Sequence, residues 1–496
     1  MTGSISIAMR IIKERSLPIG LILGIFTLIG ILYLPLSSTL PIAGHRMLAI
    51  LAFSIIIWIS EAVSYEVSAI IITTLIAFLL GTSPTLENSN EIYGTSCAMT
   101  IALAGFSNSA LALVAGALFI ASAMNFTGLD KRIAIITLTK IGISTKRIMI
   151  GSIIVTIVLS LLVPSSTARS AAIVPIMMGV ITALNINKNS NISAGIMIIV
   201  AHATGIWNIG IKTAAAQNLL TVGFMEKILG KTVTWSDWFI AGAPWSLMMS
   251  VILVMIVIKI LPPEKNNSFL NKDIQNHSLE NLGPITSSQK RLLFVSFLLL
   301  CLWFTEGKLH KFDTTSTTYL GLIFLILPKF GVMSWRDIQA RVPWGTLMVF
   351  GVGISLGSAL LSTQAAQWLG EQVILIIGLD QLESWKIFSI LSAFLIIIHL
   401  GFASATALAS SILPIMIAVL TAIPYDFDWT GLIMLLGFST SYGFILPINA
   451  PQNMICMSTG TFNAKKFATI GILITVIGYL VMVLFSITYW KWLGWI

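Results

Sequence analysis

The chain has 496 residues, of which 56% are hydrophobic and only 9% charged, and its net charge at pH 7 is +9. A soluble domain carries about 25% charged residues, so this composition excludes a soluble protein and indicates a multi-pass membrane protein. The positive charge predicts basic cytoplasmic loops and argues against nucleic-acid binding. Cys97, Cys301 and Cys456 lie far apart in the sequence, which favours neither a disulfide framework nor a metal site.

Apolar segments of membrane-spanning length recur along the whole chain. A span needs about 20 apolar residues, so there is room for about a dozen passes. The basic start, with Arg10, Lys13 and Arg15, is expected to be a cytoplasmic leader to a retained first helix, not a cleaved signal peptide. Two apolar stretches, 147–184 and 387–423, are interrupted midway by polar residues, and we expect each to be a re-entrant hairpin. The eleven expected spanning helices are 17–36, 46–62, 66–81, 100–125, 193–225, 238–260, 292–308, 317–330, 342–365, 430–458 and 467–489.

The two interrupted stretches repeat each other. Residues 165–177 and 404–416 are identical at seven of thirteen positions at an offset of 239, and Ala216-Gln217-Asn218 matches Pro451-Gln452-Asn453 at an offset of 235. Two halves that each contain two polar interruptions within their apolar segments are typical of a secondary transporter with its substrate site at the repeat interface. We expect a leader and first helix at 1–40, a first inverted repeat at 41–261, a cytoplasmic linker at 262–291 and a second inverted repeat at 292–496.

The charges of the loops predict opposite orientations for the two repeats. Loop 82–99 carries Glu87 and Glu91 but no Lys or Arg, so we expect it outside, whereas loop 126–147 carries five basic residues and is expected inside. The same rule opens the first hairpin to the cytoplasm and the second to the outside. It leaves the N-terminus in the cytoplasm and the C-terminus outside.

The four polar interruptions form the candidate site. Hydroxyls and backbone N–H groups at the hairpin tips, 164–167 and 401–406, can bind carboxylate or sulfate oxygens at the start of a helix. Spans 193–225 and 430–458 are each expected to be two half-helices around an unwound segment, whose carbonyls can hold Na⁺. The alternative is a set of ordinary polar kinks packed between helices, but the repeat pairs all four. The expected substrate-binding residues are Ser165, Ser166, Thr167, Arg169, Ser404, Ala405, Thr406, Asn218 and Asn453, and the expected residues for sodium or its replacement are Ser165, Gly210, Lys212, Thr213, Ser404, Asn449, Ala450 and Pro451.

Two cations lie inside these apolar segments. Arg169 lies one turn past the first tip, where it can face a substrate carboxylate, or it can make a contact within the hairpin or to another helix. Lys212 lies at the unwinding of span 193–225, either beside a cation site or as a lysine whose ammonium extends from a helix end to the membrane interface.

The motifs resemble those of the divalent anion:sodium symporters, which carry dicarboxylates, tricarboxylates or sulfate, from about residue 40 to 490. Residues 164–169 look like the Pro-Ser-Asn-Thr-Ala-Arg tip of the citrate, tartrate and 2-oxoglutarate/malate exchanger branch, and residues 404–407 resemble its second tip. The resemblance implies a homodimer in which each protomer has a scaffold and a moving transport domain. The family's tip Asn is replaced by Ser166 and Ala405, which puts sodium coupling in doubt.

These features predict an all-α integral membrane protein of the elevator type in the inner or plasma membrane, in contact with lipid. It is expected to carry small di- or tricarboxylates by alternating access, by exchange or with sodium, and to need no cofactor other than Na⁺. We expect the moving domain to hold both hairpins, both broken helices and spans 238–260 and 467–489. A fixed charge at Arg169 or Lys212 is hypothesised to replace the first sodium. The alternatives are a sulfate carrier and, from another class, an anion channel; no pattern of an intramembrane enzyme is present.

Overall fold

The computed structural model of the chain describes residues 19–35, 37, 39–141, 145–184, 186–264, 283–424 and 427–496. The regular elements within these ranges are all helices, which confirms the expected all-α class. Ten of the described helices are long and apolar enough to cross a membrane. The leader residues Arg10, Lys13 and Arg15 and most of the linker 262–291 lie outside the described ranges.

The chain forms two compact units, and each unit draws on both halves of the sequence. Unit 1 comprises Met1–Ser107, Trp344–Gly378 and Ser410–Pro424, and unit 2 comprises Asn108–Pro343, Leu379–Ala409 and Tyr425–Ile496. The boundaries expected at 41, 262 and 292 separate the sequence repeats, whereas the units combine segments from both repeats. The repeat boundaries therefore stay a prediction.

Unit 1 is held together where small residues let helices approach closely. A Cβ on Gly105 would lie 2.1 Å from the carbonyl oxygen of Gly351, so only glycine fits this crossing. The Gly105 N–H donates to Ser355 Oγ at 2.9 Å, which satisfies a buried backbone donor. The helices of this unit are α2 (Ile19–Tyr33), α3 (Ile42–Ser60), α4 (Tyr65–Leu75), the π-helical turn η1 (Ile76–Leu80), α5 (Thr95–Leu103), the 3₁₀ turn η2 (Ala104–Ser107), α17 (Trp344–Ser362) and α18 (Ala365–Ile377).

The single span expected at 100–125 is wrong. The chain ends helix α5 and turn η2 at Ser107 and starts a new helix, α6 (Ser109–Thr127), in unit 2. Asn108 caps this helix, because its side-chain oxygen accepts a hydrogen bond of 2.8 Å from the Ala110 N–H. The sequence signal was the polar run 107–109, which lies inside an otherwise apolar stretch.

Two further described helices of more than ten residues were not expected. Helix α7 (Leu129–Ile141) lies within the loop predicted at 126–147, and α18 follows the span predicted at 342–365. Both have 13 residues and carry charged or polar side chains, so a search for apolar runs of spanning length passes over them.

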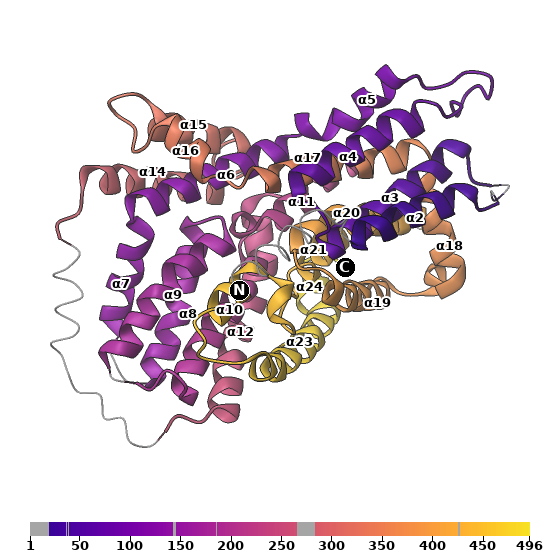
Figure 1. The fold of residues 1–496 in the computed structure, drawn as a ribbon. Helices are drawn as coiled ribbons and strands as arrows, with labels where there is room; N and C mark the ends of the chain where they lie inside the picture. Colours follow the sequence, from indigo (N-terminus) through magenta and orange to yellow (C-terminus); the bar gives the residue numbers. More distant parts are fainter. Residues whose placement is uncertain are drawn as a thin grey trace, which may run out of the picture. The chain divides into compact units, whose positions relative to one another are not determined.

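Unit 2 is built around α10 (Asn191–Gly210), which is buried along its entire length. Helices α8, α9, α12 and α22 pack against it, and Figure 1 shows α8, α9 and α10 side by side. The other elements of this unit are α6, α7, α8 (Thr145–Leu162), α9 (Ser166–Ala183), η3 (Lys212–Ala214), α11 (Ala216–Phe224), η4 (Met225–Leu229), α12 (Trp235–Ile260), α14 (Ser287–Thr305), α15 (Thr314–Ile326), α16 (Trp335–Arg341), η5 (Leu379–Gln381), α19 (Ser384–Ile398), η6 (His399–Gly401), the start of α20 (Ala405–Ala422), α21 (Thr430–Ser439), η7 (Pro447–Asn449), α22 (Pro451–Met457), α23 (Ala464–Ile487) and α24 (Tyr489–Trp492).

Candidate functional site

The two broken spans have the same backbone conformation around the break. In each, an extended residue is followed by a three-residue 3₁₀ turn, a second extended residue and a new helix. The second extended residue is Ala215 in the first half (φ −148°, ψ 146°) and Ala450 in the second (φ −156°, ψ 139°). The match at an offset of 235 shows that the internal repeat seen in sequence is also a repeat of structure.

The same asparagine stabilises each break. Asn218 Nδ2 donates to the carbonyl of Asn208 at 2.6 Å, and Asn453 Nδ2 donates to the carbonyl of Gly443 at 2.8 Å. Donor and acceptor are both related by the offset of 235. Each amide thus satisfies a carbonyl that the break leaves without a helical partner. Asn218 Oδ1 stays buried without a partner among the described residues.

The hairpin tips are also built alike. Ser165 Oγ accepts the Ala168 N–H at 3.3 Å at the start of α9, and Ser404 Oγ accepts the Ala407 N–H at 3.3 Å at the start of α20. The repeated serine is therefore a helix cap at both tips.

Three hydroxyl-bearing side chains follow these caps. Ser166 and Thr406 are half-buried and Thr167 is exposed. Among the described residues their hydroxyls have no hydrogen-bond partner, so they can donate to an anion at a helix N-terminus. Ala405, also expected at the site, offers its backbone N–H only.

Arg169 joins the first tip to the first break. Its Nη1 donates to the carbonyls of Val163 at 2.9 Å and Ala214 at 2.8 Å, and its Nη2 donates to Asn208 Oδ1 at 2.5 Å. The side chain is fully buried and its three acceptors are neutral oxygens. No carboxylate of the described chain pairs with it, so a whole positive charge remains at the tip.

Asn449 connects the second tip to the second break, but unlike Arg169 it belongs to the break and not to the hairpin. Its Nδ2 donates to the carbonyls of His399 at 3.0 Å, Leu400 at 3.2 Å and Phe402 at 2.9 Å. Its Oδ1 accepts the Leu446 N–H at 3.2 Å, which fixes the orientation of the amide.

The residues that make these contacts occupy matching positions in the two repeats. Val163 matches Phe402 at the tips, and Ala214 matches Asn449 at the breaks. In the first half the donor comes from the hairpin, and in the second half it comes from the break. In the first half the donor bonds carbonyls on both sides of the gap, and in the second half it bonds carbonyls of the tip.

Asn208 is a site residue that the sequence analysis did not select. Its side chain accepts from Arg169 and its carbonyl accepts from Asn218, so it connects the tip to the break. The sequence signal that could have identified Asn208 is a polar side chain within an apolar helix, at the position that matches Gly443 in the second repeat. Gln217 Nε2 donates to Ser441 Oγ at 3.0 Å and so joins the first broken span to the second.

The other expected cation residues have separate contacts. Thr213 Oγ1 accepts the indole N–H of Trp235 at 3.2 Å, and Gly210 packs closely on Ser246. Pro451 begins α22 as its first residue, where a missing N–H has no cost. Lys212 Nζ donates to the carbonyl of Val233 at 2.7 Å and lines a cavity that contains no residue of either tip.

Among the described residues, ten helices are long and apolar enough to cross a membrane, and two unwound spans match each other in caps and breaks, an arrangement typical of membrane transporters. A family model described as the sodium:sulfate symporter transmembrane region matches residues 15–496. The chain therefore belongs to this family, the divalent anion:sodium symporters.

Relatives of known sequence cover nearly the whole chain. A "membrane protein" of Cupriavidus necator is 60% identical over 477 residues, which is 96% of this chain and 93% of the relative. The sodium-dependent dicarboxylate transporter SdcS of Staphylococcus saprophyticus is 27% identical (94% and 90% covered). The L-tartrate/succinate antiporter of Escherichia coli K12 is 26% identical (95% and 96% covered).

A solved structure supports the fold. The crystal structure of the YdaH transporter of Alcanivorax borkumensis aligns with a TM-score of 0.54 at 12% identity, over 85% of this chain and 96% of that one. At this identity the likeness concerns the fold alone.

Proposed function

We propose that the protein carries small di- or tricarboxylates by alternating access and exchanges one anion for another. The observation that carries this proposal is the buried guanidinium of Arg169, which has only neutral partners beside the free hydroxyls of the first tip. A buried charge without a counterion is costly. A substrate carboxylate at the tip supplies the missing negative charge.

The tips support an anionic substrate with several oxygens. Helices α9 and α20 begin at the tips, and their first N–H groups and the hydroxyls of Ser166, Thr167 and Thr406 form two donor clusters. A dicarboxylate has one carboxylate for each cluster. The names of two relatives, a dicarboxylate transporter and a tartrate/succinate antiporter, agree with this class.

The buried acceptor of Asn218 adds a preference within that class. Its Nδ2 bonds to Asn208 and Ile211 hold the amide in one orientation, so Oδ1 can only accept. A substrate hydroxyl is a suitable donor, which favours malate, tartrate or citrate over succinate.

The hydrogen bonds at the two gaps argue against a sodium site there. Sodium is coordinated by several carbonyl oxygens, whereas Arg169 bonds those of Val163 and Ala214, and Asn449 bonds those of His399, Leu400 and Phe402. The fixed charge of Arg169 cannot leave with the product. The empty carrier therefore keeps an uncompensated charge and returns poorly, which favours exchange over net transport.

The movement proposed is that of an elevator transporter, in which a transport domain carries the tips across the membrane against a scaffold. The homodimer, the plasma or inner membrane location, the cytoplasmic N-terminus and the outer C-terminus remain parts of this proposal. They rest on the family resemblance and on the charges of the loops.

Purified protein in proteoliposomes tests the substrate class. Uptake of labelled malate, citrate, succinate and sulfate is measured with the same unlabelled anion inside, and we expect malate and citrate to exceed sulfate. Sulfate uptake faster than that of every carboxylate would favour the sulfate carrier instead. Single-channel currents in planar bilayers would indicate a channel.

A further inference from the structure

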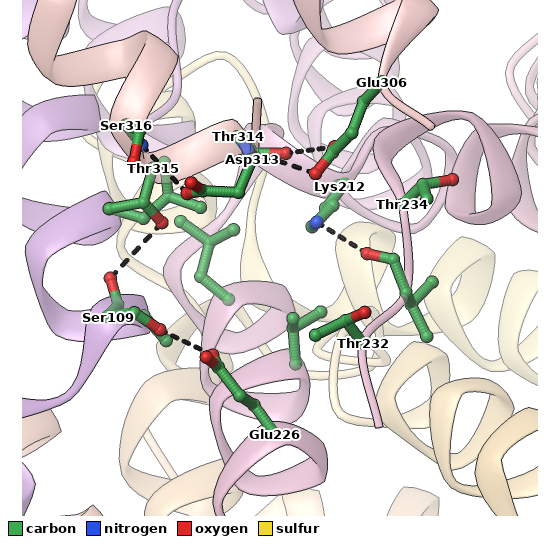
Figure 2. Close-up of a pocket in the computed structure, with 15 residues that line it drawn as sticks. Ser109, Lys212, Glu226, Thr232, Thr234, Glu306, Asp313, Thr314, Thr315 and Ser316 are labelled. Carbon is green, nitrogen blue, oxygen red and sulfur yellow. Dashed lines mark hydrogen bonds between the residues drawn. The ribbon is translucent and has the colours of Figure 1, made fainter. Parts of the chain in front are cut away.

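Unit 2 contains a cavity of about 320 Å³. It is lined by the start of α6, the turns η3 and η4, helix α11, the loop before α12, the loop after α14 and the start of α15 (Figure 2). This volume lies at the lower end of the range for small-molecule sites. Since no residue of either hairpin tip lines the cavity, it is separate from the proposed transport site.

The cavity is positive at its inner wall and negative at its mouth. Lys212 is only 4% exposed, and its ammonium donates to the neutral carbonyl of Val233. Glu226 and Asp313 are exposed, and Glu306 is half-buried. Figure 2 shows these carboxylates around the space into which the Lys212 ammonium points.

Neutral donors hold the three carboxylates in place. Glu226 accepts from Ser109 Oγ at 2.5 Å, and Glu306 accepts from Thr314 Oγ1 at 2.6 Å. Partial burial raises the pKa of Asp313, but hydrogen bonds from the side chain and N–H of Ser316 outweigh it and leave the pKa below its usual value. The carboxylates are therefore oriented, and among the described residues none of the three forms a salt bridge.

The charge pattern selects a kind of ligand. The His, Cys, Asp and Glu residues of the described chain form no group of three that could hold a metal ion, so a larger ligand fits better than an ion. A dicarboxylate would place its second negative end among the carboxylates at the mouth. An amine without a carboxylate would leave the Lys212 ammonium unpaired.

We propose that this cavity binds a zwitterionic amino acid with an apolar side chain. The carboxylate of the ligand accepts from the Lys212 ammonium, and its own ammonium donates to the carboxylates at the mouth. The apolar side chain lies against Leu113, Leu219 and Val222, which form the remaining wall. The site is additional to anion transport and does not depend on it.

Isothermal titration of the full-length protein in nanodiscs tests this proposal with three probes of similar shape. L-leucine carries both charges, 4-methylpentanoate lacks the ammonium, and 3-methylbutylamine lacks the carboxylate. We expect leucine to bind at least about tenfold more tightly than either analogue, because each analogue loses one charge-assisted contact.

Two substitutions at the mouth complete the test. Glu226→Gln and Asp313→Asn should each weaken leucine binding by about tenfold or more while malate binding is retained, which shows that the protein is folded. Glu371→Gln, which removes an exposed charge on α18 in unit 1, is the matched control and should bind leucine like the wild type. The proposal is overturned if leucine does not bind, if either analogue binds as tightly, or if leucine binding survives both mouth substitutions.

Discussion

The guanidinium of Arg169 donates a hydrogen bond of 2.8 Å to the carbonyl oxygen of Ala214, which ties the first turn of α9 to the unwound segment of the neighbouring span. The equivalent position of the second hairpin is Leu408, whose side chain cannot make this contact. The resemblance to the sodium-coupled members of the family implies a cation site at the first gap. In this chain the guanidinium of Arg169 fills that gap.

Removing this donor should create a sodium site. Arg169→Ala leaves the carbonyls of Val163 and Ala214 and the side-chain oxygen of Asn208 without a partner, at about 1–3 kcal/mol each. We expect a lower melting temperature in choline chloride that sodium chloride partly restores, measured by thermal unfolding in detergent. Leu408→Ala, the matched substitution in the second repeat, should lose stability equally in both salts. A sodium effect that is absent in Arg169→Ala, or equal in both variants, contradicts this prediction.

The hydroxyls of the two tips should contribute to substrate affinity. Thr167→Val and Thr406→Val keep the side-chain shape but remove a hydroxyl donor to the substrate carboxylate, so each should raise the KM of uptake by about 5- to 150-fold, or about 1–3 kcal/mol. Thr182→Val on the same helix α9 is the control, because that exposed hydroxyl bonds only to its own helix at Met178. If both tip variants keep the wild-type KM, the substrate lies elsewhere.

The amide of Asn449 should stabilise the second tip. Asn449→Ala leaves the carbonyls of His399, Leu400 and Phe402 unpaired, so we expect a loss of about 1–3 kcal/mol in the free energy of unfolding. Amide hydrogen exchange at residues 402–406 should become faster. Asn189→Ala, at an exposed loop position, is the control and should leave both quantities unchanged. Unchanged exchange at the tip in Asn449→Ala would show that the tip does not depend on this amide.

The charges of the loops predict which positions face the cytoplasm. In a variant without the three native cysteines, single cysteines at Ser287 and Lys465 should react with an impermeant maleimide only from the cytoplasmic side. Cysteines at Gln381 and Asp428 should react only from outside. Labelling of the last two positions from opposite sides would make the second hairpin a full span and remove the inverted topology.

Much of this architecture is readable from the sequence, because membrane spans need long apolar runs and the repeat preserves its caps and breaks. Ser165 and Ser404 were selected as tip residues, and the structure shows both as helix caps. The corrections come from short signals: Asn108 ends one apolar run in mid-span, α7 and α18 are too short to be found by span length, and α7 is also charged.

The partners of the charged residues could not be predicted, since the side-chain directions at a break depend on tertiary packing. Arg169 and Lys212 are both cations near the first break, yet Arg169 reaches the carbonyls of the tip and the break, whereas Lys212 reaches Val233 at a separate cavity. Asn208 was passed over because a single polar residue in an apolar helix has many roles.

The central claim is that fixed protein donors take the place of sodium and make exchange the natural mode. Labelled malate uptake into proteoliposomes, with and without internal malate and in sodium or choline buffer, tests it most directly. The account predicts uptake that requires the internal anion and is nearly equal in the two buffers. Steep activation by external sodium in liposomes that contain no counter-anion would contradict it.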